Sequence, residues 1–466
     1  MEIILATINA KWIHPSLALR LLKANLGELE DKCEILEFAL RQPLREKVEG
    51  ILAAQPRILG LSVSIWNHKE TIELFRVLNG SWQKPHEKPV IVLGGPEVSW
   101  LDEDAEIFRY ADYIIRGEGE ESFAALCRDI LSGKPLRSYN AKYNKETTVD
   151  LNKINTAYHL YTDEDIKGKL IYAESSRGCP FSCEFCQAAS GSVRYFHLEQ
   201  FLTDMDTLIH RGARIIKFLD RTFNLNMDRV GKIMTFFLER INALDNPPEV
   251  HFEFVPSVLS PELKNLLRRF PPGTLRLEIG IQTLNPETAA LIKRPFDSNT
   301  ALETLQFLRC ETNALLHIDL IAGLPGEDLA SFGRGFDRLW QILSCKTAAA
   351  EKFEIQSGIL KCLPGTPISR HNENHKMRYS PEPPYEVIET GAIPEKDMER
   401  LKNFARFWEI IVNRYHFPEL AGQLFPAGQP AFEKFMDLSD RLLAHFGKNW
   451  GIERDKIRNF LQTMNR

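Results

Sequence analysis

Three cysteines lie within eight residues of one another in the segment RGCPFSCEFCQAAS, directly after a predicted strand. Cys179, Cys183 and Cys186 have the spacing C-x3-C-x2-C. Three thiolates on one short loop can bind three irons of a four-iron cubane and leave the fourth iron without a protein ligand. An open metal position suits catalysis, as it does in zinc enzymes. A structural zinc knuckle is the alternative, but it needs a fourth ligand, the nearest downstream histidine is His197, and no second C-x2-C follows.

The other five cysteines are scattered along the chain, at Cys33, Cys127, Cys310, Cys345 and Cys362. One cluster with dispersed single cysteines indicates metal binding in a reducing compartment. The start, MEIILATINAKW, has no basic region and no cleavage site of a signal peptide. No uncharged apolar run approaches the roughly 18–20 residues that cross a bilayer. We therefore expect a cytoplasmic protein without a membrane partner, and we interpret Cys362 as an inert buried thiol rather than a hydrogen donor.

The composition is that of an ordinary globular protein. Of the 466 residues, 44% are hydrophobic and 26% are charged, which excludes intrinsic disorder as the main state. Lys and Arg total 58 against 63 Asp and Glu, so the net charge is −5. Without a bulk positive field the composition disfavours nucleic acid as a partner, although a local basic patch stays possible.

The elements before the cysteine loop predict an α/β domain over residues 1–133. Five short apolar runs alternate with amphipathic segments: EIILATI, CEILEFAL, RILGLSVSIW, PVIVLGG and ADYIIRG. Such runs are typical of parallel strands covered on both faces, so we expect a doubly wound, flavodoxin-like sheet. Residues 134–168 are polar with weak periodicity, and we expect an interdomain linker there.

A second series of strands and helices begins at Lys169. Its six β segments are KLIYAESSRG, ARIIKFLD, EVHFEFVPSV, TLRLEIGIQTL, LLHIDLIAGLP and KFEIQSGIL, with amphipathic helices such as 199–209, 227–244 and 300–308 between them. This alternation predicts a partial (β/α)6 barrel of the TIM type over residues 169–375. The Pro-rich stretch RYSPEPPYEVIET is expected to be a linker. Helices over 395–412 and 432–446 then predict a small helical C-terminal domain, residues 376–466.

The cysteine spacing, with an aromatic residue (Phe185) before the last cysteine and a βα barrel behind it, resembles the radical S-adenosylmethionine superfamily. The resemblance implies a [4Fe–4S] cluster on Cys179, Cys183 and Cys186. It also implies that S-adenosylmethionine chelates the fourth iron through its amino and carboxylate groups. One electron, from a donor such as flavodoxin or ferredoxin, then cleaves the sulfonium to give a 5′-deoxyadenosyl radical.

Four later motifs resemble strand ends of the same family. They are FLDRTFNLN (218–226), LEIGIQTLN (277–285), DLIAGLPGE (319–327) and the closing turn LPGTP (363–367). Each is weak alone, because Gly-Leu-Pro-Gly can be a plain turn, but in order at strand ends they agree with where barrel sites are built. The resemblance implies that S-adenosylmethionine is bound by residues drawn from Phe185, Asp220, Arg221, Asn224, Glu278, Gln282, Ile321 and Gly323.

The N-terminal domain resembles the cobalamin-binding domain of the cobalamin-dependent group of this superfamily. Polar and glycine residues follow its last three strands, where doubly wound sheets bind ligands: Ser62, Ser64, Gly94, Gly95, Glu97, Gly117 and Gly119. The D-x-H-x-x-G motif that supplies a cobalt-binding histidine in related enzymes is absent, because His14, His68 and His86 all lack its flanking residues. A domain that binds nothing, or only positions substrate, is the alternative.

These resemblances predict a radical S-adenosylmethionine enzyme that methylates an unactivated carbon of a small-molecule substrate with cobalamin. One alternative is a cobalamin-free enzyme of rearrangement, cyclisation or sulfur insertion, and another is an iron–sulfur protein without turnover. A tRNA methylthiotransferase is disfavoured, since the first 150 residues offer only Cys33 and Cys127 and the tail is helical rather than a basic β-barrel. The identity of the substrate is not encoded in any motif of the chain.

Overall fold

The computed structural model describes residues 1–82, 88–134, 148–189, 191–256, 259–294, 297–344, 353–414, 417, 425 and 429–464. Two of the residues considered above, His86 and Cys345, lie outside these ranges. The chain divides into two compact units. Unit 1 is Met1–Ser175 with Arg194–Lys217, and unit 2 is Ser176–Val193 with Phe218–Arg466.

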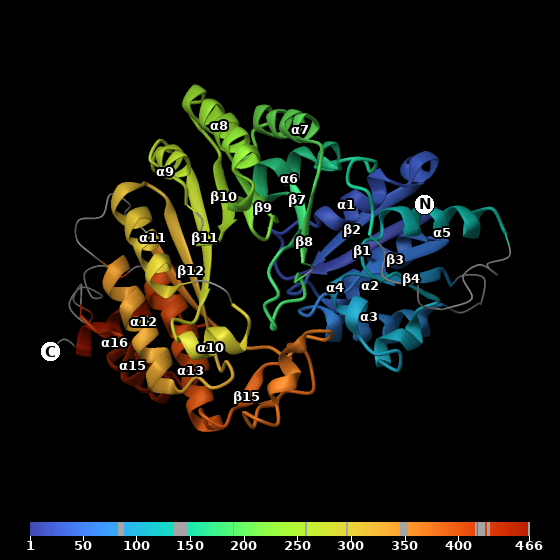
Figure 1. Cartoon of the computed structure of the whole chain (residues 1–466). Coiled ribbons are helices and arrows are strands. Elements are labelled where there is room, and N and C mark those ends of the chain that lie inside the picture. Colours follow the sequence, from blue (N-terminus) through green and yellow to red (C-terminus); the bar gives the residue numbers. More distant parts are fainter. Residues whose placement is uncertain are drawn as a thin grey trace. The chain divides into compact units, whose positions relative to one another are not determined.

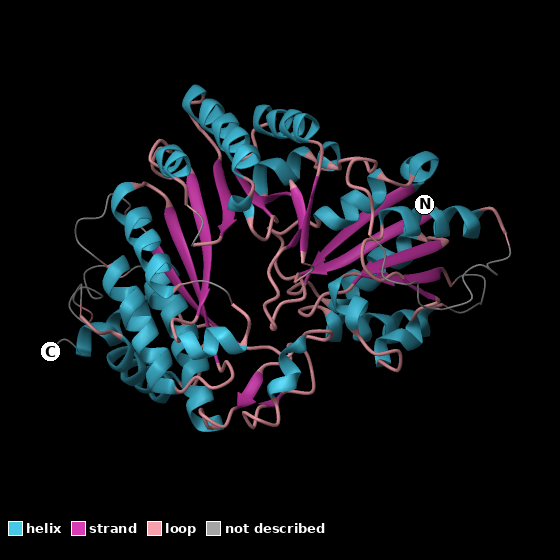
Figure 2. Cartoon of the chain, viewed as in Figure 1, coloured by secondary structure: helices cyan, strands magenta, loops and turns pink. Residues whose placement is uncertain are grey.

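The N-terminal part of unit 1 contains a five-stranded parallel sheet with helices on both faces (Figures 1 and 2). Its strand order is β2-β1-β3-β4-β5, which is the flavodoxin-like doubly wound order. The strands are β1 (Ile3–Asn9), β2 (Cys33–Ala39), β3 (Ile58–Ser62), β4 (Val90–Gly94) and β5 (Tyr113–Ile114). The expected fold of this domain is confirmed.

Strand β1 shows why both faces of this sheet are covered. All seven of its residues are buried. Ile4, Ala6 and Ile8 pack into one apolar cluster, while Ile3 and Leu5 pack into another, because successive side chains of a strand point to opposite faces. The covering helices are α1 (Leu17–Ala24), α2 (Leu44–Ala54), α3 (His68–Ser81), α4 (Pro96–Trp100) and α5 (Glu120–Leu131), with 3-10 turns η1 (Gly27–Lys32) and η3 (Glu106–Tyr110).

The described residues of the expected linker, 148–168, are folded rather than extended between domains. They contain the 3-10 turn η4 (Tyr158–Leu160) and the helix α6 (Asp163–Gly168), which a Thr162–Asp165 capping box begins. The buried Asp165 carboxylate pairs with Arg20 at 2.7 Å and with Lys169 at 2.8 Å. Three apolar residues, Val149, Leu151 and Ile154, pack with Phe196 and hold the segment in place. Their irregular spacing matches neither a helix nor a strand period, so the sequence did not predict this packing.

The second parallel sheet has the strand order β13-β12-β11-β10-β9-β6 and matches the expected partial barrel. Its strands are β6 (Ile171–Ala173), β9 (Ile215–Phe218), β10 (Glu249–Phe254), β11 (Leu275–Gln282), β12 (Leu315–Ala322) and β13 (Phe353–Ile359). The helices of this series are α7 (Leu198–His210), α8 (Met227–Ala243), α9 (Pro261–Leu267), α10 (Pro286–Leu291), α11 (Ser298–Glu311) and α12 (Leu329–Leu343), with the 3-10 turn η5 (Phe223–Leu225).

The central strands of this sheet have one apolar and one polar face. In β11 the odd-numbered residues 275–281 are buried, while Arg276, Glu278 and Gln282 are partly exposed on the other face. Strand β12 repeats the pattern with His317 and Asp319, and the register sets Glu278 opposite His317. Polar residues therefore gather on one face of neighbouring strands.

The segment that carries the cysteines differs from the prediction in one respect. The run KLIYAESSRG, expected to be one strand, forms β6 and a separate short strand, β7 (Ser176–Cys179). Strand β7 pairs with β8 (Ser192–Tyr195) in a two-stranded sheet, and the cysteine loop lies between them. The end of β7 is thus also the beginning of the loop.

The expected linker at RYSPEPPYEVIET is instead a small antiparallel sheet of β14 (Arg378–Tyr379) and β15 (Val387–Glu389), which follows the 3-10 turn η6 (Pro367–His371). The sequence did not predict this pairing, because the strands are very short and the prolines between them are typical of loops. The helical C-terminal region is confirmed, with α13 (Glu395–Trp408), a π-helix over Glu409–Arg414, α15 (Phe432–Phe446) and α16 (Arg454–Met464). Its core is aromatic: the Trp408 ring centroid lies 4.7 Å from Phe336 and 4.8 Å from Phe435.

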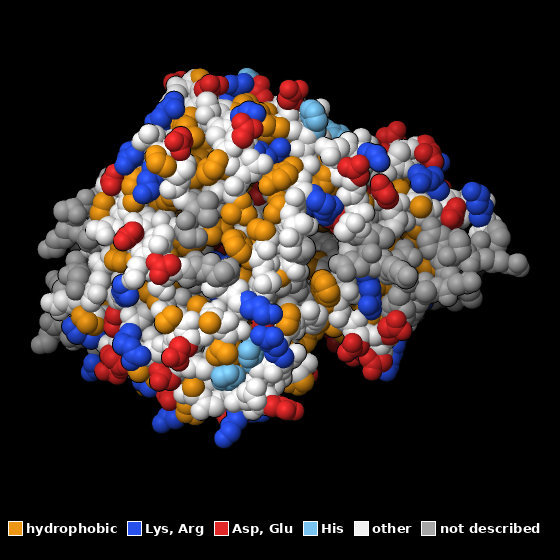
Figure 3. All heavy atoms as spheres, in the orientation of Figure 1, with side chains coloured by type: hydrophobic (Ala, Val, Ile, Leu, Met, Phe, Trp, Pro, Cys, Tyr) orange, Lys and Arg blue, Asp and Glu red, His pale blue; other side chains and the backbone are white. Residues whose placement is uncertain are grey.

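The distribution of charged side chains on the surface agrees with the small net charge of the chain. On the face drawn in Figure 3, Lys and Arg side chains are interspersed with Asp and Glu. Across the residues that the structure describes, no helix combines the length and apolar character needed to cross a membrane.

Candidate functional site

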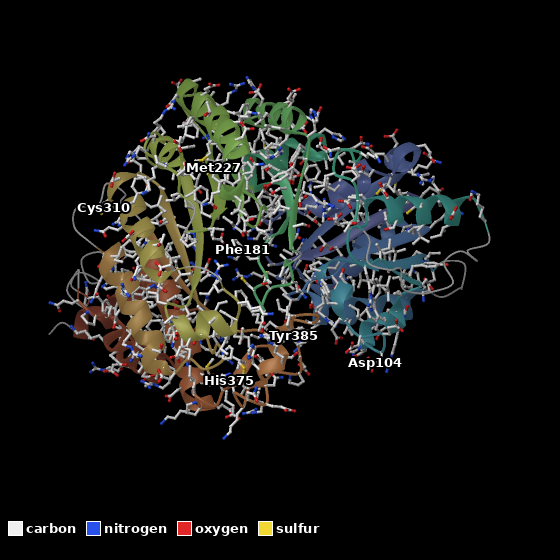
Figure 4. The ribbon with its side chains drawn as sticks, viewed as in Figure 1. Asp104, Phe181, Met227, Cys310, His375 and Tyr385 are labelled. Atoms are coloured by element: carbon white, nitrogen blue, oxygen red, sulfur yellow. The ribbon has the colours of Figure 1, made fainter. Side chains whose placement is uncertain are left out.

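The cysteine loop begins where β7 ends. Two backbone hydrogen bonds fold it: the Gly191 N–H donates to the Cys179 carbonyl at 2.9 Å, and the Cys186 N–H donates to the Cys183 carbonyl at 3.1 Å. Cys183 is only 4% exposed, and Cys179 and Cys186 are half-buried. Burial raises the pKa of the Cys179 thiol. Figure 4 labels Phe181, which belongs to the same loop.

All three cysteines line one cavity of about 180 Å³ within unit 2. Phe181 and Phe185 of the same loop also line it. Ala188 and Ala189 of the loop line it as well, and the remaining walls come from strands β10 to β12, from residues that follow β9 and β10, and from the turn after α10: Arg221, Thr222, Glu253, Phe254, Val255, Glu278, Gly280, Gln282, Arg294 and Asp319. This is the end of a parallel barrel at which active sites are built.

The donor set of this cavity fits an iron–sulfur cluster. In a cubane each thiolate binds a different iron, so the three sulfurs must share a cavity rather than surround one point. Among the described residues, no three His, Cys, Asp or Glu side chains are grouped around a single ion position. Arg294 adds a positive charge beside the sulfurs, since its Nη1 lies 3.6 Å from the Cys183 Sγ. Soft thiolates with a neighbouring cation suit an anionic cluster of this kind.

Charged side chains of both signs surround the cysteines. Arg221 lies 3.6 Å from Glu253, measured from Nη1 to Oε1, and the Glu278 Oε2 lies 3.1 Å from the His251 Nε2. Arg294 also donates a hydrogen bond to the Gly280 carbonyl, which fixes its guanidinium at the end of β11. The cavity therefore offers cations for a carboxylate and carboxylates for an amine or a diol.

On the same polar face of the sheet, two residues before Asp319, lies the partly buried His317. The His317 Nε2 lies 3.2 Å from Asp319, and its Nδ1 lies 2.7 Å from Glu354. Burial lowers the pKa of His317, but these two carboxylates overcome that effect and raise it to about 9. His317 is therefore protonated at neutral pH, and it forms an ion pair with the Asp319 carboxylate.

Gln282 stands out by its backbone. Its φ is +68°, in the left-handed region that a residue with a side chain rarely occupies. The register between β11 and β12 shifts between Gly280 and Gln282, so the strand carries an irregularity where it meets the cavity. Strain of this kind costs about 1–3 kcal/mol and concentrates at functional sites.

The structure brings part of the predicted S-adenosylmethionine set together. Phe185, Arg221, Glu278 and Gln282 line the cavity, whereas Asp220, Asn224, Ile321 and Gly323 are not among its lining residues.

Asp220 and Asn224 are buried and engaged elsewhere. Asp220 accepts a 2.6 Å hydrogen bond from the Ser176 hydroxyl. Asn224 exchanges two hydrogen bonds, of 2.8 and 2.9 Å, with the Val255 backbone. Ser176 begins β7 and Val255 lines the cavity, so Asp220 and Asn224 hold segments that form its walls. Contact of Asp220 or Asn224 with a ligand stays a prediction.

Gly323 has a packing reason to be glycine. A Cβ at this position, where φ is +84°, would lie 2.5 Å from the Val387 side chain of β15 and 3.1 Å from Met398 of α13. The glycine thus lets the C-terminal segments pack against the end of β12. Its expected approach to adenine, like that of Ile321, stays a prediction.

Three charged cavity residues were missed by the sequence interpretation: Glu253, Arg294 and Asp319. Asp319 stands in the quoted motif DLIAGLPGE and shares a strand face with Ile321, so strand alternation was the signal for it. Arg294 lies in a turn after α10, and nothing in its local sequence indicates its position beside Cys183.

In unit 1 the seven cobalamin candidates lie at or just after the carboxyl ends of β3, β4 and β5, the edge where doubly wound sheets bind ligands. Among these candidates, Gly95 lies in close contact with the end of β3. Its φ is +104°, and a Cβ there would meet the Val63 carbonyl oxygen at 2.6 Å and the Ser62 hydroxyl at 2.9 Å. The turn after β4 therefore requires glycine for its own packing against the end of β3.

The other candidates at this edge are partly engaged within the domain. The Ser64 N–H donates to the Asn67 side chain at 2.8 Å, and the Gly117 N–H donates to the Ser99 hydroxyl at 3.2 Å. The Glu97 carboxylate, 2% exposed, bonds the His68 Nδ1 at 2.8 Å, a partnership that the sequence did not indicate. Ser62, Gly94 and Gly119 are half-buried at the same edge, so backbone groups rather than free side chains dominate it.

Comparisons with known proteins match both domains. The model of the Radical SAM superfamily matches residues 174–338, and the model of the B12 binding domain matches residues 3–127. The chain is 23% identical over 387 residues to the cobalamin-dependent radical SAM methyltransferase TokK of Streptomyces tokunonensis, an alignment that covers 77% of this chain and 54% of TokK. The chain thus spans about half the length of this curated relative.

Two solved structures share the fold. The cobalamin-dependent S-adenosylmethionine radical enzyme OxsB, with aqua-cobalamin bound, superposes with a TM-score of 0.66 at 15% identity, covering 95% of this chain and 75% of OxsB. The radical S-adenosylmethionine methyltransferase TsrM of Kitasatospora setae, with cobalamin and a [4Fe–4S] cluster bound, gives a TM-score of 0.58 at 18% identity, covering 79% and 74% of the two chains.

The two matched domains account for the cysteine loop and for the doubly wound sheet, respectively. With both domains in one polypeptide, the chain has the domain pair of the cobalamin-dependent radical S-adenosylmethionine group, whose cofactors are a [4Fe–4S] cluster, S-adenosylmethionine and cobalamin.

Proposed function

We propose that this protein is a cobalamin-dependent radical S-adenosylmethionine methyltransferase that methylates an unactivated carbon of a small molecule. The single observation that carries the proposal is the cavity in unit 2, where three thiols of one loop meet two arginines and three carboxylates. The methyltransferase name of TokK and the B12-binding match over residues 3–127 support methylation as the outcome.

In this proposal Cys179, Cys183 and Cys186 hold the [4Fe–4S] cluster. The cluster, when bound and reduced, supplies the electron that cleaves the sulfonium of S-adenosylmethionine, and cobalamin supplies the methyl group. The one-electron step requires a reductant, and we infer a donor such as flavodoxin or ferredoxin. The free, dispersed cysteines support a reducing, cytoplasmic location.

The charged residues of the cavity suit the parts of S-adenosylmethionine. Arg294 and Arg221 can bind a carboxylate, since a guanidinium presents paired donors to it. Glu253, Glu278 and Asp319 can accept from an ammonium group or from ribose hydroxyls. His317 lies 3.2 Å from Asp319 and orients this carboxylate. Phe181 and Phe185 exclude water from the same space, which strengthens each of these interactions.

The test begins with anaerobic purification and the measurement of iron, sulfide and corrinoid per chain. After reduction with dithionite, the protein is incubated with S-adenosylmethionine and assayed for 5′-deoxyadenosine. We expect product from the wild type and none from the triple variant Cys179→Ala, Cys183→Ala, Cys186→Ala. Equal amounts from both would refute the assignment of the cysteines.

The same preparation separates the two alternatives. A cobalamin-free radical enzyme would form 5′-deoxyadenosine without binding added corrinoid, as followed by the absorbance of the co-eluting protein. An iron–sulfur protein without turnover would show iron but no 5′-deoxyadenosine, and its EPR signal would not change on addition of S-adenosylmethionine.

A further inference from the structure

Glu184 is a buried carboxylate inside the cysteine loop, between Cys183 and Phe185. Its side chain has no exposed surface. Its Oε1 lies 2.5 Å from the Arg370 Nη2 and 3.2 Å from the Lys293 Nζ, and its Oε2 accepts from the His371 Nε2 at 2.8 Å. These contacts come from two separate segments, the turn after α10 and the 3-10 turn η6.

Such an arrangement has to be specific because an unpaired carboxylate is costly to bury. Removal of water from an ion pair is offset only when the remaining oxygens also find partners. In Glu184 the Oε2 accepts a hydrogen bond from His371, whereas the Oε1 has no hydrogen-bond partner among the described residues and is balanced by the nearby charges of Arg370 and Lys293. The Glu184 side chain is not among those that line the cavity, so ligand contact gives no reason for its charge.

The contacts of Glu184 connect the cysteine loop to the residue that lies beside its sulfurs. The Glu184 N–H donates to the Ile292 carbonyl at 3.1 Å, and its carboxylate pairs with Lys293. The next residue, Arg294, extends its guanidinium to within 3.6 Å of the Cys183 sulfur. Lys293 has a φ of +51°, an unfavourable value for lysine that the surrounding contacts maintain.

A second contact attaches the loop to the closing turn of the barrel. The Gln187 side chain donates to the Pro364 carbonyl at 2.9 Å, in the LPGTP turn that leads into η6. After η6, the His375 N–H donates to the His371 carbonyl at 3.0 Å, which holds the backbone of the residue that bonds Glu184 (His375 is labelled in Figure 4). The loop is thus attached on both sides of Cys186.

We propose that Glu184 is a positioning residue that holds the cysteine loop, and Arg294 with it, in the arrangement that receives the cluster. The inference rests on the proposed function in that Cys179, Cys183 and Cys186 are the cluster ligands. It adds that the loop is shaped before the cluster binds, by the ion pairs of Glu184 with Lys293 and Arg370 and by its hydrogen bond with His371.

The first experiment uses the full-length protein without its cluster. Glu184→Gln removes the charge and keeps the shape, and Glu373→Gln removes an exposed carboxylate next to η6 as the matched control. Iodoacetamide labelling is followed for each cysteine by peptide mass spectrometry. We expect labelling of Cys179, Cys183 and Cys186 to become at least fivefold faster in Glu184→Gln and to stay within twofold of wild type in Glu373→Gln.

The buried cysteines of unit 1 separate positioning from general destabilisation. Cys33 and Cys127 are 1% and 0% exposed, so their labelling reports opening of the fold elsewhere. Positioning predicts that only the three loop cysteines change. Equal acceleration at all five sites would assign Glu184 a merely structural role and overturn the proposal.

A second measurement follows the protein after cluster reconstitution. We expect Glu184→Gln to lose iron to a chelator at least fivefold faster than wild type and to show an altered EPR line shape in the reduced state. Glu184→Asp, which restores the charge on a shorter side chain, should recover part of both properties. An unchanged rate and an unchanged spectrum in Glu184→Gln would contradict the proposal.

The partner residue provides a variant from the other side of the ion pair. Arg370 is half-exposed, so Arg370→Gln tests the same contact even if Glu184→Gln does not fold. We expect accelerated labelling of the loop in Arg370→Gln and no further acceleration in the double variant, because both changes remove one interaction. Additive effects, or wild-type labelling in Arg370→Gln, would contradict the coupling.

These outcomes are distinguishable from failure of the proposed function. Labelling of cluster-free protein reports the shape of the loop whether or not the wild type forms 5′-deoxyadenosine. If the wild type is inactive but Glu184→Gln labels faster, the proposed function fails and the positioning role remains.

Discussion

Single residues give the cavity its chemistry, and the Arg294 Nη1 lies 3.6 Å from the Cys183 sulfur. We predict that Arg294→Gln weakens S-adenosylmethionine binding by about 10- to 100-fold, since a charge-assisted hydrogen bond contributes about 1.5–3 kcal/mol. The measurement is equilibrium dialysis with protein of matched iron content. Arg269→Gln, which removes an exposed arginine of the same unit, is the control and should bind like the wild type. Unchanged binding in Arg294→Gln would remove this residue from the site.

His317 predicts how stability depends on pH. Because its pKa is raised from 6.5 to about 9 in the folded state, the stabilisation is complete below pH 6.5 and is lost as pH rises through 9. We expect the free energy of unfolding to fall by up to roughly 3 kcal/mol over this range, at 1.36 kcal/mol per pKa unit. Denaturant unfolding of wild type and His317→Asn at pH 6, 8 and 10 tests this, since the difference between the two proteins should shrink with pH. Parallel curves would contradict it.

Glu327 gives a second pH effect of a different origin. Burial raises its pKa to about 7, and although its Oε1 accepts from the Thr283 hydroxyl at 2.7 Å, its Oε2 has no hydrogen-bond partner among the described residues. The folded state therefore binds a proton more tightly than the unfolded chain, and the contribution of Glu327 to stability falls as pH rises from 4.5 to 7. We expect Glu327→Gln to remove this dependence, so that its stability relative to wild type is higher at pH 8 than at pH 5. The opposite trend in paired melting curves would contradict this.

At the scale of elements, the turn between β4 and α4 depends on Gly95. Gly95→Ala would bring a Cβ to 2.6 Å from the Val63 carbonyl oxygen at a φ of +104°. We expect destabilisation of about 1–3 kcal/mol in denaturant unfolding and weaker corrinoid binding, because the edge of the sheet must shift. Gly80→Ala in α3, where a Cβ would meet nothing within 4 Å, is the control and should be neutral or stabilising. Equal stability of the two variants would contradict the packing argument.

The same scale shows what the sequence could and could not predict. Helix α15 has the predicted bounds, Phe432–Phe446, because amphipathic periodicity and a Gly447 terminus are local signals. The cavity residues Glu278 and Gln282 were predicted from motifs at strand ends. Arg294 was missed, since its place beside Cys183 arises from tertiary packing of a turn distant in sequence. The strands β14 and β15 were missed because a pair this short leaves no period.

At the scale of the whole molecule, two cofactor-binding domains are encoded by different stretches of one chain. We predict that the triple variant Cys179→Ala, Cys183→Ala, Cys186→Ala binds as much corrinoid as the wild type, and that Gly95→Ala retains its iron. Corrinoid absorbance and iron content of the purified full-length proteins measure the two cofactors separately. Loss of corrinoid from the cysteine variant would mean that the two sites load interdependently.

The left-handed backbone of Gln282 has a consequence for engineering this chain. A thermostability selection from a random library at position 282 would enrich glycine, which adopts a φ of +68° without cost. The selected variants would lack the amide that lines the cavity, and we expect them to be more stable but to form less 5′-deoxyadenosine. Consensus or stability-guided redesign of this enzyme should therefore leave residue 282 unaltered.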